Sequence, residues 1–241
     1  MTATMPDLHV ALVHGAFADS SGWNGVIERL QDAGIEATAI SNPLRGVQED
    51  SAYVASAMGQ LPGPVLAVGH SYGGAVITNA ASAADNVVGL VYVAGFAPDE
   101  GETLMDIEAG SRDSVLTSVL EQHGYPTARG MEAEFRIDPT HFHEAFARDL
   151  PEKESSVMAQ TQRSASALAF SEPTGRPAWK DLPSWAVIPT GDKAAGTDVL
   201  RNMAKRAQAS VTEADGSHVI MISKPDVVAS VVMNAISALP Q

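Results

Sequence analysis

Residues 64–80 read PVLAVGHSYGGAVITNA, and this stretch decides the fold. It begins with an apolar run that ends at Val68 and is typical of a buried strand, and from Ala75 onward it places small and apolar residues at helical spacing. Between the two, Gly69–Gly73 must turn sharply, because the glycines at both ends fit where side chains would clash. Such a turn lifts the hydroxyl of Ser71 into the open above the positive end of the next helix, which predicts a nucleophile.

Further apolar runs on either side of this stretch predict more strands. They span residues 8–13, 35–40, 87–93 and 185–188, with a weaker run at 210–213. Helical patterns separate most of them, and strands that alternate with helices form right-handed βαβ crossovers and a parallel sheet covered on both faces. We therefore expect an α/β fold with a mostly parallel, six-stranded sheet flanked by helices.

The alternation stops between residues 98 and 183. This segment is polar, contains several methionines and shows no convincing strand, and it is too long for a plain loop. We interpret it as a helical insertion between two strands of the sheet, lying over the carboxyl end of the sheet as a cap. The chain then divides into a core of residues 1–97 and 184–241 and a helical cap of residues 98–183.

Composition and charge exclude several classes of protein. The 241 residues include no cysteine, which excludes disulfides, thiolate metal sites and a cysteine nucleophile. A formal net charge of -14 argues against partners that reward clustered basic residues, so we expect neither nucleic acid nor a membrane as partner. No apolar run is long enough to span a bilayer, and residues 1–8 lack the basic start of a secretory signal, so we expect a cytoplasmic protein. The oligomeric state stays open.

With a strand, a serine turn and a helix in this order, the chain resembles the α/β-hydrolase superfamily, and within it the small, capped, esterase-like members. The resemblance covers essentially the whole chain except residues 98–183, where only the existence of an insertion corresponds. It implies an α/β-hydrolase fold in which a serine works with a histidine and an acid. That mechanism needs no cofactor and no metal, and we expect neither. His141 and His143 do not suggest a metal site, because histidines two positions apart point to different faces of a helix.

The resemblance places the base late in the chain, after the last strand. A serine hydroxyl is a weak nucleophile and needs a base within hydrogen-bond reach. His218 follows the weak strand at 210–213 and precedes the helix that begins near Pro225, so it falls at the same end of the sheet as Ser71. The other six histidines fit less well, since they lie in the first strand, on the turn itself, in the loop after the first strand, or in the insertion.

The third member of the triad orients the imidazole and stabilises its charged form. Asp192 follows the apolar run 185–188 closely, after a glycine, as the superfamily pattern requires. Asp99 is the alternative acid, because it follows the run 87–93, and some members of the superfamily place their acid there. Asp198 is another acid close to Asp192 in the sequence, but we expect it to cap or open the next helix. We favour Asp192.

The resemblance also implies an oxyanion hole made of two backbone N–H groups. One belongs to Tyr72, the residue after the nucleophile, and the other to the loop after the first strand, where His14-Gly15-Ala16-Phe17 stands. We choose Ala16, with Phe17 as the alternative. Three aromatic residues are candidates to line the substrate pocket, although core packing is their more frequent role: Phe17, Trp23 and Phe96. Six apolar side chains of the insertion indicate either pocket lining or helix packing: Met105, Met131, Phe135, Phe142, Phe146 and Met158.

These residues predict a serine hydrolase that cleaves a small to medium carboxylic ester or lactone through an acyl-enzyme, with a small molecule as its partner. Plant-type hydroxynitrile lyases are loosely similar, but Val219 and Gly15 stand where they carry a lysine and a threonine, which argues against a lyase. Two alternatives stay open. One is a small-ligand-binding protein on the same fold with little or no turnover, and the other is a carbon–carbon bond hydrolase or perhydrolase with the same triad.

Overall fold

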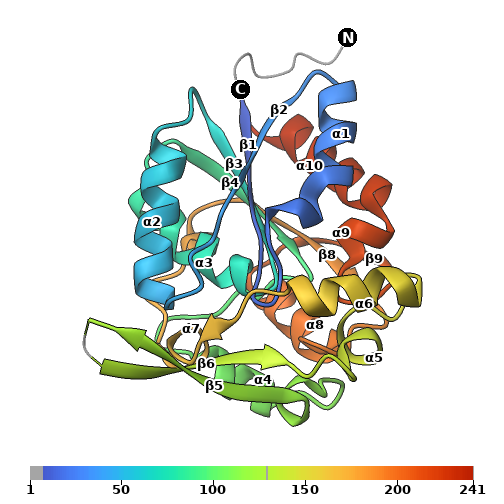
Figure 1. The fold of residues 1–241 in the computed structure, drawn as a ribbon. Coiled ribbons are helices and arrows are strands. Elements are labelled where there is room, and N and C mark those ends of the chain that lie inside the picture. Colours follow the sequence, from blue (N-terminus) through green and yellow to red (C-terminus); the bar gives the residue numbers. More distant parts are fainter. Residues whose placement is uncertain (1–7, 129, 241) are drawn as a thin grey trace.

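The computed structural model describes residues 8–128 and 130–240, and its centre is one large sheet (Figure 1). The six strands of this sheet are β1 (His9–Val13), β2 (Glu36–Ile40), β3 (Val65–His70), β4 (Val87–Val93), β8 (Ser184–Pro189) and β9 (Ser210–Ala214). They lie in the order β2-β1-β3-β4-β8-β9, and every neighbouring pair is parallel. The expected six-stranded α/β sheet is confirmed.

The order of the strands marks where a site is to be expected. From β1 the chain first builds β2 at one edge, and then it crosses back past β1 to build β3 on the other side. Ligands of open parallel sheets bind outside the carboxyl ends of the strands, at the point where the strand order reverses. The loops after β1 and β3 meet at that point, and they carry Ala16 and Ser71.

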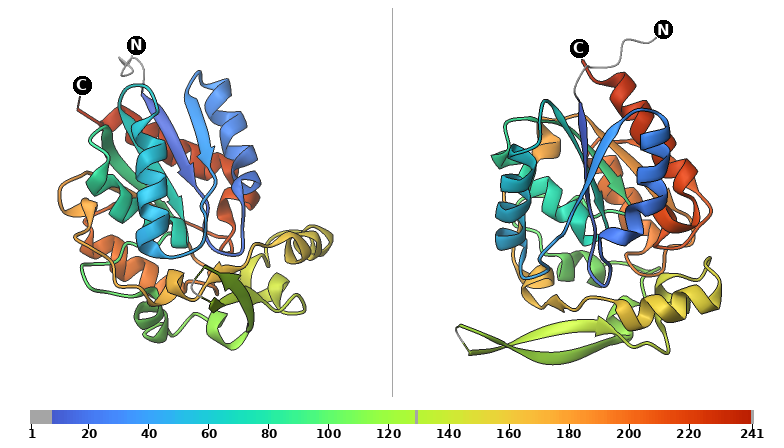
Figure 2. Two further views of the ribbon diagram at one scale, coloured as in Figure 1. Left: turned by 60° about the vertical axis from the view of Figure 1, so that its left-hand side comes forward. Right: turned by 45° about the horizontal axis from the view of Figure 1, so that its top comes forward.

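Helices cover both faces of the large sheet (Figure 2). On one face α1 (Asn24–Asp32) packs against α10 (Pro225–Ala238), and on the other α2 (Val47–Gly59) packs against α3 (Tyr72–Ala80). The remaining helices of this part are α8 (Thr197–Arg206), which connects β8 to β9, and the short η1 (Ser20–Trp23), η2 (Ala81–Ala83) and α9 (Ile220–Ser223). Because both faces are covered, every residue of β1 and β3 is buried.

Residues 98–183, which we call the insert, stand between β4 and β8 in the chain, and most of them lie beyond the carboxyl ends of the strands (Figure 1). The insert contains the helices α4 (Leu104–Ala109), α5 (Phe142–Phe146), α6 (Glu152–Thr161) and α7 (Leu168–Ser171) and the single turns η3 (Leu116–Ser118) and η4 (Ala178–Lys180). It also contains a second, antiparallel sheet, in the order β5 (Leu120–Thr127), β6 (Gly130–Ile137) and β7 (Ala165–Ser166).

The expectation of a purely helical insertion is therefore wrong, since a β5–β6 hairpin forms much of the insert. The hairpin gives no apolar alternation in the sequence, because most side chains of β5 are exposed on both of its faces. Gly124 and Pro126 stand inside β5 and further weaken its strand pattern. Proline is tolerated there because β5 is an edge strand.

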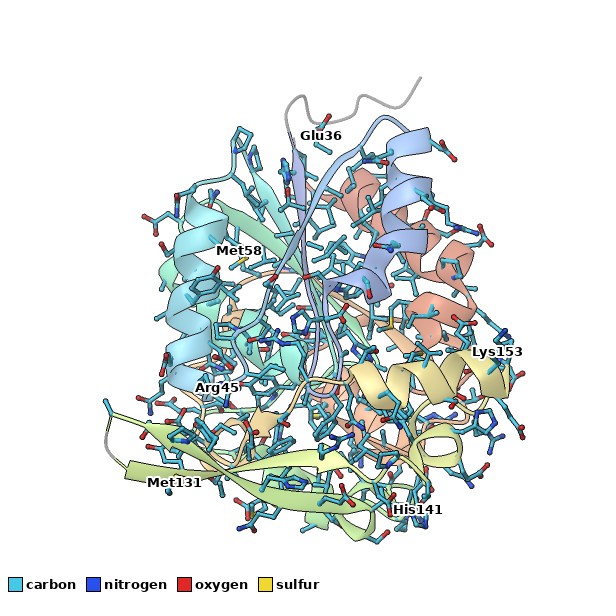
Figure 3. The ribbon with its side chains drawn as sticks, viewed as in Figure 1. Glu36, Arg45, Met58, Met131, His141 and Lys153 are labelled. Atoms are coloured by element: carbon cyan, nitrogen blue, oxygen red, sulfur yellow. The ribbon has the colours of Figure 1, made fainter. Side chains whose placement is uncertain are left out.

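Side chains of the two parts differ in their surroundings (Figure 3). Met58 of α2 has no exposed surface, whereas Met131 of β6 is 71% exposed.

None of the described helices is both long and apolar enough to cross a membrane. Residues 1–7, which carry most of the segment used above to argue against a secretory signal, lie outside the described residues.

Candidate active site

Ser71 stands at a strained turn between β3 and α3. Its backbone has φ 52° and ψ −126°, a combination that residues other than glycine rarely adopt, and it is the N-cap residue of α3. A Cβ atom at Gly69 would lie 2.5 Å from the carbonyl oxygen of Gly73, so the turn closes only because residue 69 is glycine. The serine therefore sits at the positive end of α3, at the carboxyl edge of the sheet.

The imidazole of His218 is paired with Asp192. His218 Nδ1 donates to Asp192 Oδ2 at 2.7 Å, and both side chains are buried. The other carboxylate oxygen accepts the N–H groups of Ala194 and Ala195 at 2.9 and 3.0 Å, which fixes the carboxylate in place. Because Nδ1 carries the donated proton, Nε2 of the neutral imidazole is left as the basic nitrogen.

His70 connects the serine turn to the loop of His218. Its Nε2 donates to the carbonyl oxygen of His218 at 2.9 Å, and the centroids of the two imidazoles are 4.8 Å apart. Burial, together with the nearby His218, lowers the pKa of His70 well below its ordinary value, so its ring is neutral. Ser71 and His218 thus lie at the same edge of the sheet. No hydrogen bond joins Ser71 Oγ to the imidazole within the described chain.

The loop after β1 is held by His14. Asn42 donates its backbone N–H to His14 Nε2 at 3.0 Å, and His14 Nδ1 donates to the carbonyl oxygen of Gly15 at 2.9 Å. Burial lowers the pKa of His14 to about 4, so the ring stays neutral and keeps this pattern. Since the C=O and N–H of one peptide point in opposite directions, the bond to Gly15 fixes the direction of the Ala16 N–H. A Cβ atom at Gly15 would lie 2.6 Å from Ser71 Cβ, so this loop passes directly beside Ser71.

Tyr72 is anchored by a buried carboxylate. Its hydroxyl donates to Asp50 Oδ2 at 2.6 Å, and Asp50 also accepts the backbone N–H of Arg45. Asp50 has no exposed surface, and burial raises its pKa above the ordinary value. Burial likewise raises the pKa of the Tyr72 hydroxyl, which therefore remains a donor. The anchor holds the first residue of α3, whose backbone N–H stands next to the serine.

The three aromatic residues proposed from the sequence as pocket lining lie in different places. The ring of Phe17 stacks on Phe170 with centroids 6.0 Å apart, and Phe17 lines the cavity described below. Trp23 is fully buried, and its ring is nearly perpendicular to that of His70 at a centroid distance of 6.4 Å. Phe96 is buried, and its backbone N–H donates to the carbonyl oxygen of Ser71 at 3.1 Å. Neither Trp23 nor Phe96 lines that cavity.

Asp99, the alternative acid, is engaged elsewhere. Its Oδ1 accepts from Lys180 Nζ at 2.5 Å, and this bond lowers the pKa of the Asp99 carboxyl. The structure thus places Asp192, and not Asp99, against His218. Asp198 lies in the first turn of α8, as the sequence predicts, and accepts from the hydroxyl of Ser111 at 2.7 Å.

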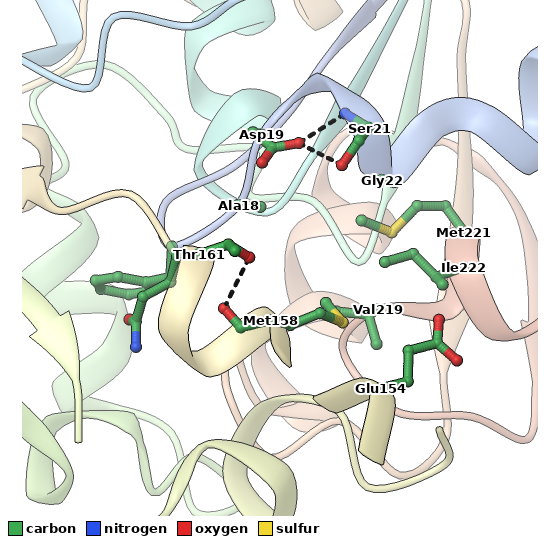
Figure 4. Close-up of a pocket in the computed structure, with 12 residues that line it drawn as sticks. Ala18, Asp19, Ser21, Gly22, Glu154, Met158, Thr161, Val219, Met221 and Ile222 are labelled. Atoms are coloured by element: carbon green, nitrogen blue, oxygen red, sulfur yellow. Dashed lines mark hydrogen bonds between the residues drawn. The ribbon is translucent and has the colours of Figure 1, made fainter. Parts of the chain in front are cut away.

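A cavity of about 160 Å³, open to solvent, lies next to the site (Figure 4). Phe17 from the loop after β1, Met158 from α6 and Val219, which follows His218, form part of its wall. Met221 and Ile222 extend the apolar surface, and the carboxylates of Asp19 and Glu154 add negative charge. No residue that lines the cavity carries a positive charge, and Ser71 itself does not line it.

Several residues that hold the site were not found from the sequence. Asn42 donates its side-chain N–H to the carbonyl oxygen of His14 at 3.0 Å, and Arg163 of the insert donates to the carbonyl oxygen of Asn42 at 2.7 Å. Asp50 and His70 belong to the same set. Single polar residues in loops and helices carry no periodic signal, and only their position at the carboxyl edge of the sheet connects them.

Within residues 8–128 and 130–240, no group of three or more histidine, aspartate or glutamate side chains is arranged to hold a metal ion. His141 bonds to Asp138, and His143 bonds to Ser155, so the two histidines point to separate partners.

A parallel sheet with a serine on a strained strand-to-helix turn and a histidine–aspartate pair at the same edge defines the α/β-hydrolase class of fold. The chain belongs to the alpha/beta hydrolase family, since the model of that family matches residues 10–231. No curated protein gives a match.

Solved structures share the fold at low sequence identity. Polyneuridine aldehyde esterase superposes with a TM-score of 0.79 at 18% identity, over 95% of this chain and 99% of the other. A methylesterase from Arabidopsis gives 0.78 at 19% identity, over 95% and 99%. A pyrethroid hydrolase from Sphingobium faniae gives 0.78 at 19% identity, over 96% and 98%. At these identities the likeness is one of fold.

Proposed function

We propose that the protein is a serine hydrolase that cleaves a small to medium carboxylic ester through an acyl-enzyme. The observation that carries the proposal is the buried bond of 2.7 Å between His218 and Asp192, next to the turn that presents Ser71. The similar structures are named as an esterase, a methylesterase and a pyrethroid hydrolase, which supports ester chemistry on this fold.

In the first half of the reaction, His218 Nε2 takes the proton of the Ser71 hydroxyl as its oxygen attacks the ester carbonyl carbon. Asp192 stabilises the resulting imidazolium through Nδ1. The N–H groups of Ala16 and Tyr72 bind the oxyanion of the tetrahedral intermediate. The bond to the alcohol oxygen then breaks, and His218 returns the proton to that oxygen, which leaves the acyl group on Ser71.

In the second half, a water molecule attacks the acyl carbon while His218 Nε2 takes one of its protons. The second tetrahedral intermediate collapses, the carboxylic acid leaves, and the proton returns to Ser71. None of these steps requires a metal or a cofactor.

We further propose that residues 98–183 act as a cap over residues 1–97 and 184–241. Ser71 is 6% exposed and His218 is 1% exposed, which supports a cap that restricts access to them. The cavity between α6 and the residues after His218 opens beside them, and the apolar part of its wall suits an apolar ester.

The test is turnover of p-nitrophenyl acetate and butyrate by the wild type and by Ser71→Ala. We expect the substitution to abolish turnover, and mass spectrometry of protein treated with a phosphonate to locate the label on Ser71. Equal turnover by the two proteins would show that Ser71 is not the nucleophile. Labelling of Ser71 without ester turnover would keep the nucleophile and transfer the activity to another acyl or carbon–carbon substrate.

A further inference from the structure

The loop that carries His218 is bound to the insert as well as to the sheet. Asp149, which follows α5, accepts the backbone N–H of Ser217 through Oδ2 at 2.9 Å. Its other carboxylate oxygen accepts the hydroxyl of Ser217. Ser217 is buried, so one carboxylate satisfies both of its donors away from solvent. Although partial burial opposes the charge, the bonds from Ser217 hold the pKa of Asp149 below its ordinary value.

The imidazole of His218 also contacts two rings, whose own centroids are 6.5 Å apart. The ring of Phe146, from α5 of the insert, has its centroid 4.9 Å from that of His218, and His70 lies at 4.8 Å. The same insert segment therefore contacts the histidine ring through Phe146 and the preceding residue through Asp149. In the described residues, Asp149 is the charged group of the insert that hydrogen-bonds to Ser217.

Residues at the edge of the large sheet already restrict the movement of His218. Nδ1 is bound to Asp192, and the carbonyl oxygen accepts from His70. The backbone before His218 is held at two residues: the carbonyl oxygen of Gly216 accepts the N–H of Gly191 at 3.1 Å, and Ser217 is bound to Asp149. A displacement of about 1 Å in a catalytic group costs roughly 10²-fold in rate. Loss of this attachment would therefore act on proton transfer, and not on the binding of a small ester.

We propose that Asp149 is a positioning residue through which the insert fixes the imidazole of His218 for proton transfer from Ser71. The proposal rests on the serine hydrolase function proposed above. Asp149 acts through Ser217 and touches neither the substrate nor the reacting atoms.

The test compares Asp149→Ala, Asp149→Asn and Ser217→Ala with the wild type on p-nitrophenyl acetate. We expect Asp149→Ala to lower kcat by about 10²-fold with KM changed by less than about two-fold, because the ester site is intact while the base is displaced. Asp149→Asn keeps one oxygen acceptor and is expected to fall between Asp149→Ala and the wild type. Asp138→Asn is the control, since Asp138 is a carboxylate of the insert that bonds to Thr140 and has no bond to the loop of His218.

A double-variant cycle shows whether Asp149 acts through its partner. The combined effect of Asp149→Ala and Ser217→Ala should equal that of Asp149→Ala alone, because Asp149→Ala already removes the hydroxyl bond that Ser217→Ala removes, along with the bond from the backbone N–H of residue 217. Wild-type kcat in Asp149→Ala, or a rise in KM alone, would overturn the proposal. If Asp149→Ala fails to fold, Asp149→Asn and Ser217→Ala decide the question by the same criteria.

The outcomes separate this inference from the proposed function. Turnover that survives Ser71→Ala overturns the serine mechanism, whatever Asp149 does. Turnover that is abolished by Ser71→Ala but unchanged in Asp149→Ala overturns only the positioning role.

Discussion

The serine turn at residues 64–80 and the hairpin at residues 120–137 are built in opposite ways. In the turn, backbone packs against backbone so closely that a Cβ at Gly69 would lie 2.5 Å from the carbonyl oxygen of Gly73 in the first turn of α3. In the hairpin, backbone bonds join β5 to β6 while most side chains of β5 face solvent. The comparison teaches that the turn depends on the identity of single residues, whereas the hairpin depends mainly on its backbone.

The largest expected effect lies at the carboxyl edge of the sheet. Asp192→Asn should lower kcat on p-nitrophenyl butyrate by about 10⁴-fold, because the amide favours the wrong tautomer of His218 and cannot stabilise its imidazolium. Asp99→Asn is the matched control and should leave kcat within about two-fold, since Asp99 is paired with Lys180. The reverse outcome would transfer the role of the acid to Asp99.

Two glycine variants test the comparison directly. Gly69→Ala should lower the free energy of unfolding by about 3 kcal/mol or more, because the clash is with backbone that cannot move aside. At Gly124 the nearest atom to an added Cβ is the methyl carbon of Met131, at 3.1 Å, and that side chain is exposed and flexible. Gly124→Ala should therefore change stability by less than about 0.5 kcal/mol. Urea denaturation of both variants gives the two values, and similar losses would break the comparison.

Glu108 lies in the insert, but unlike the exposed side chains of the hairpin it is buried. It therefore tests whether part of the insert also depends on the identity of a single residue. Its Oε2 lies 2.7 Å from the hydroxyl of Ser114, which also lies 2.6 Å from the carbonyl oxygen of Ala194. Ser114 has one proton for these two oxygens, so the bond is satisfied when Glu108 carries a proton. Burial raises the pKa of Glu108 to about 8.

The sign of the pH effect follows from that shift. The unfolded chain releases the Glu108 proton near pH 4.5 and the folded chain near pH 8, so the stability that protonated Glu108 confers is complete below 4.5 and is lost as the pH rises to 8. The loss amounts to about 1.4 kcal/mol for each pH unit in that window. Glu108→Gln should lack this slope in denaturation curves measured from pH 5 to 9. An unchanged slope would mean that Glu108 does not titrate in this range.

The smallest effect is expected on the surface of the hairpin. Met131→Ser replaces a side chain that is 71% exposed. It should change the free energy of unfolding by less than about 0.5 kcal/mol and kcat by less than about two-fold. Melting and turnover on p-nitrophenyl acetate check this, and a loss of turnover would assign the hairpin a part in the site.

The same contrast explains what the sequence alone could predict. All six strands of the large sheet were predicted, because central strands such as β1 and β3 are apolar on both faces. The weakest prediction was β9, an edge strand whose side chains are mostly exposed. Asp192 and His218 were chosen from the resemblance to the α/β-hydrolase superfamily, and the rule that parallel strands end at one edge agreed with that choice.

The rest depended on contacts between distant residues. Asn42, Asp50 and Asp149 each hold a residue of the site through bonds across the fold, and no spacing in the sequence announces them. The hairpin was missed because its exposed residues show no alternation. These features follow from tertiary packing, which a pattern along the chain does not record.

The carboxylates of Asp19 and Glu154 in the cavity wall have a consequence for product release after the proposed ester hydrolysis. Ester cleavage turns a neutral molecule into a carboxylate, and the cavity beside His218 contains Asp19 and Glu154 with no cation among its lining residues. A newly formed anion is repelled there by charges of its own sign. We therefore expect the acid product to depart quickly and to inhibit weakly, while the alcohol, which stays uncharged, competes more effectively for the same space.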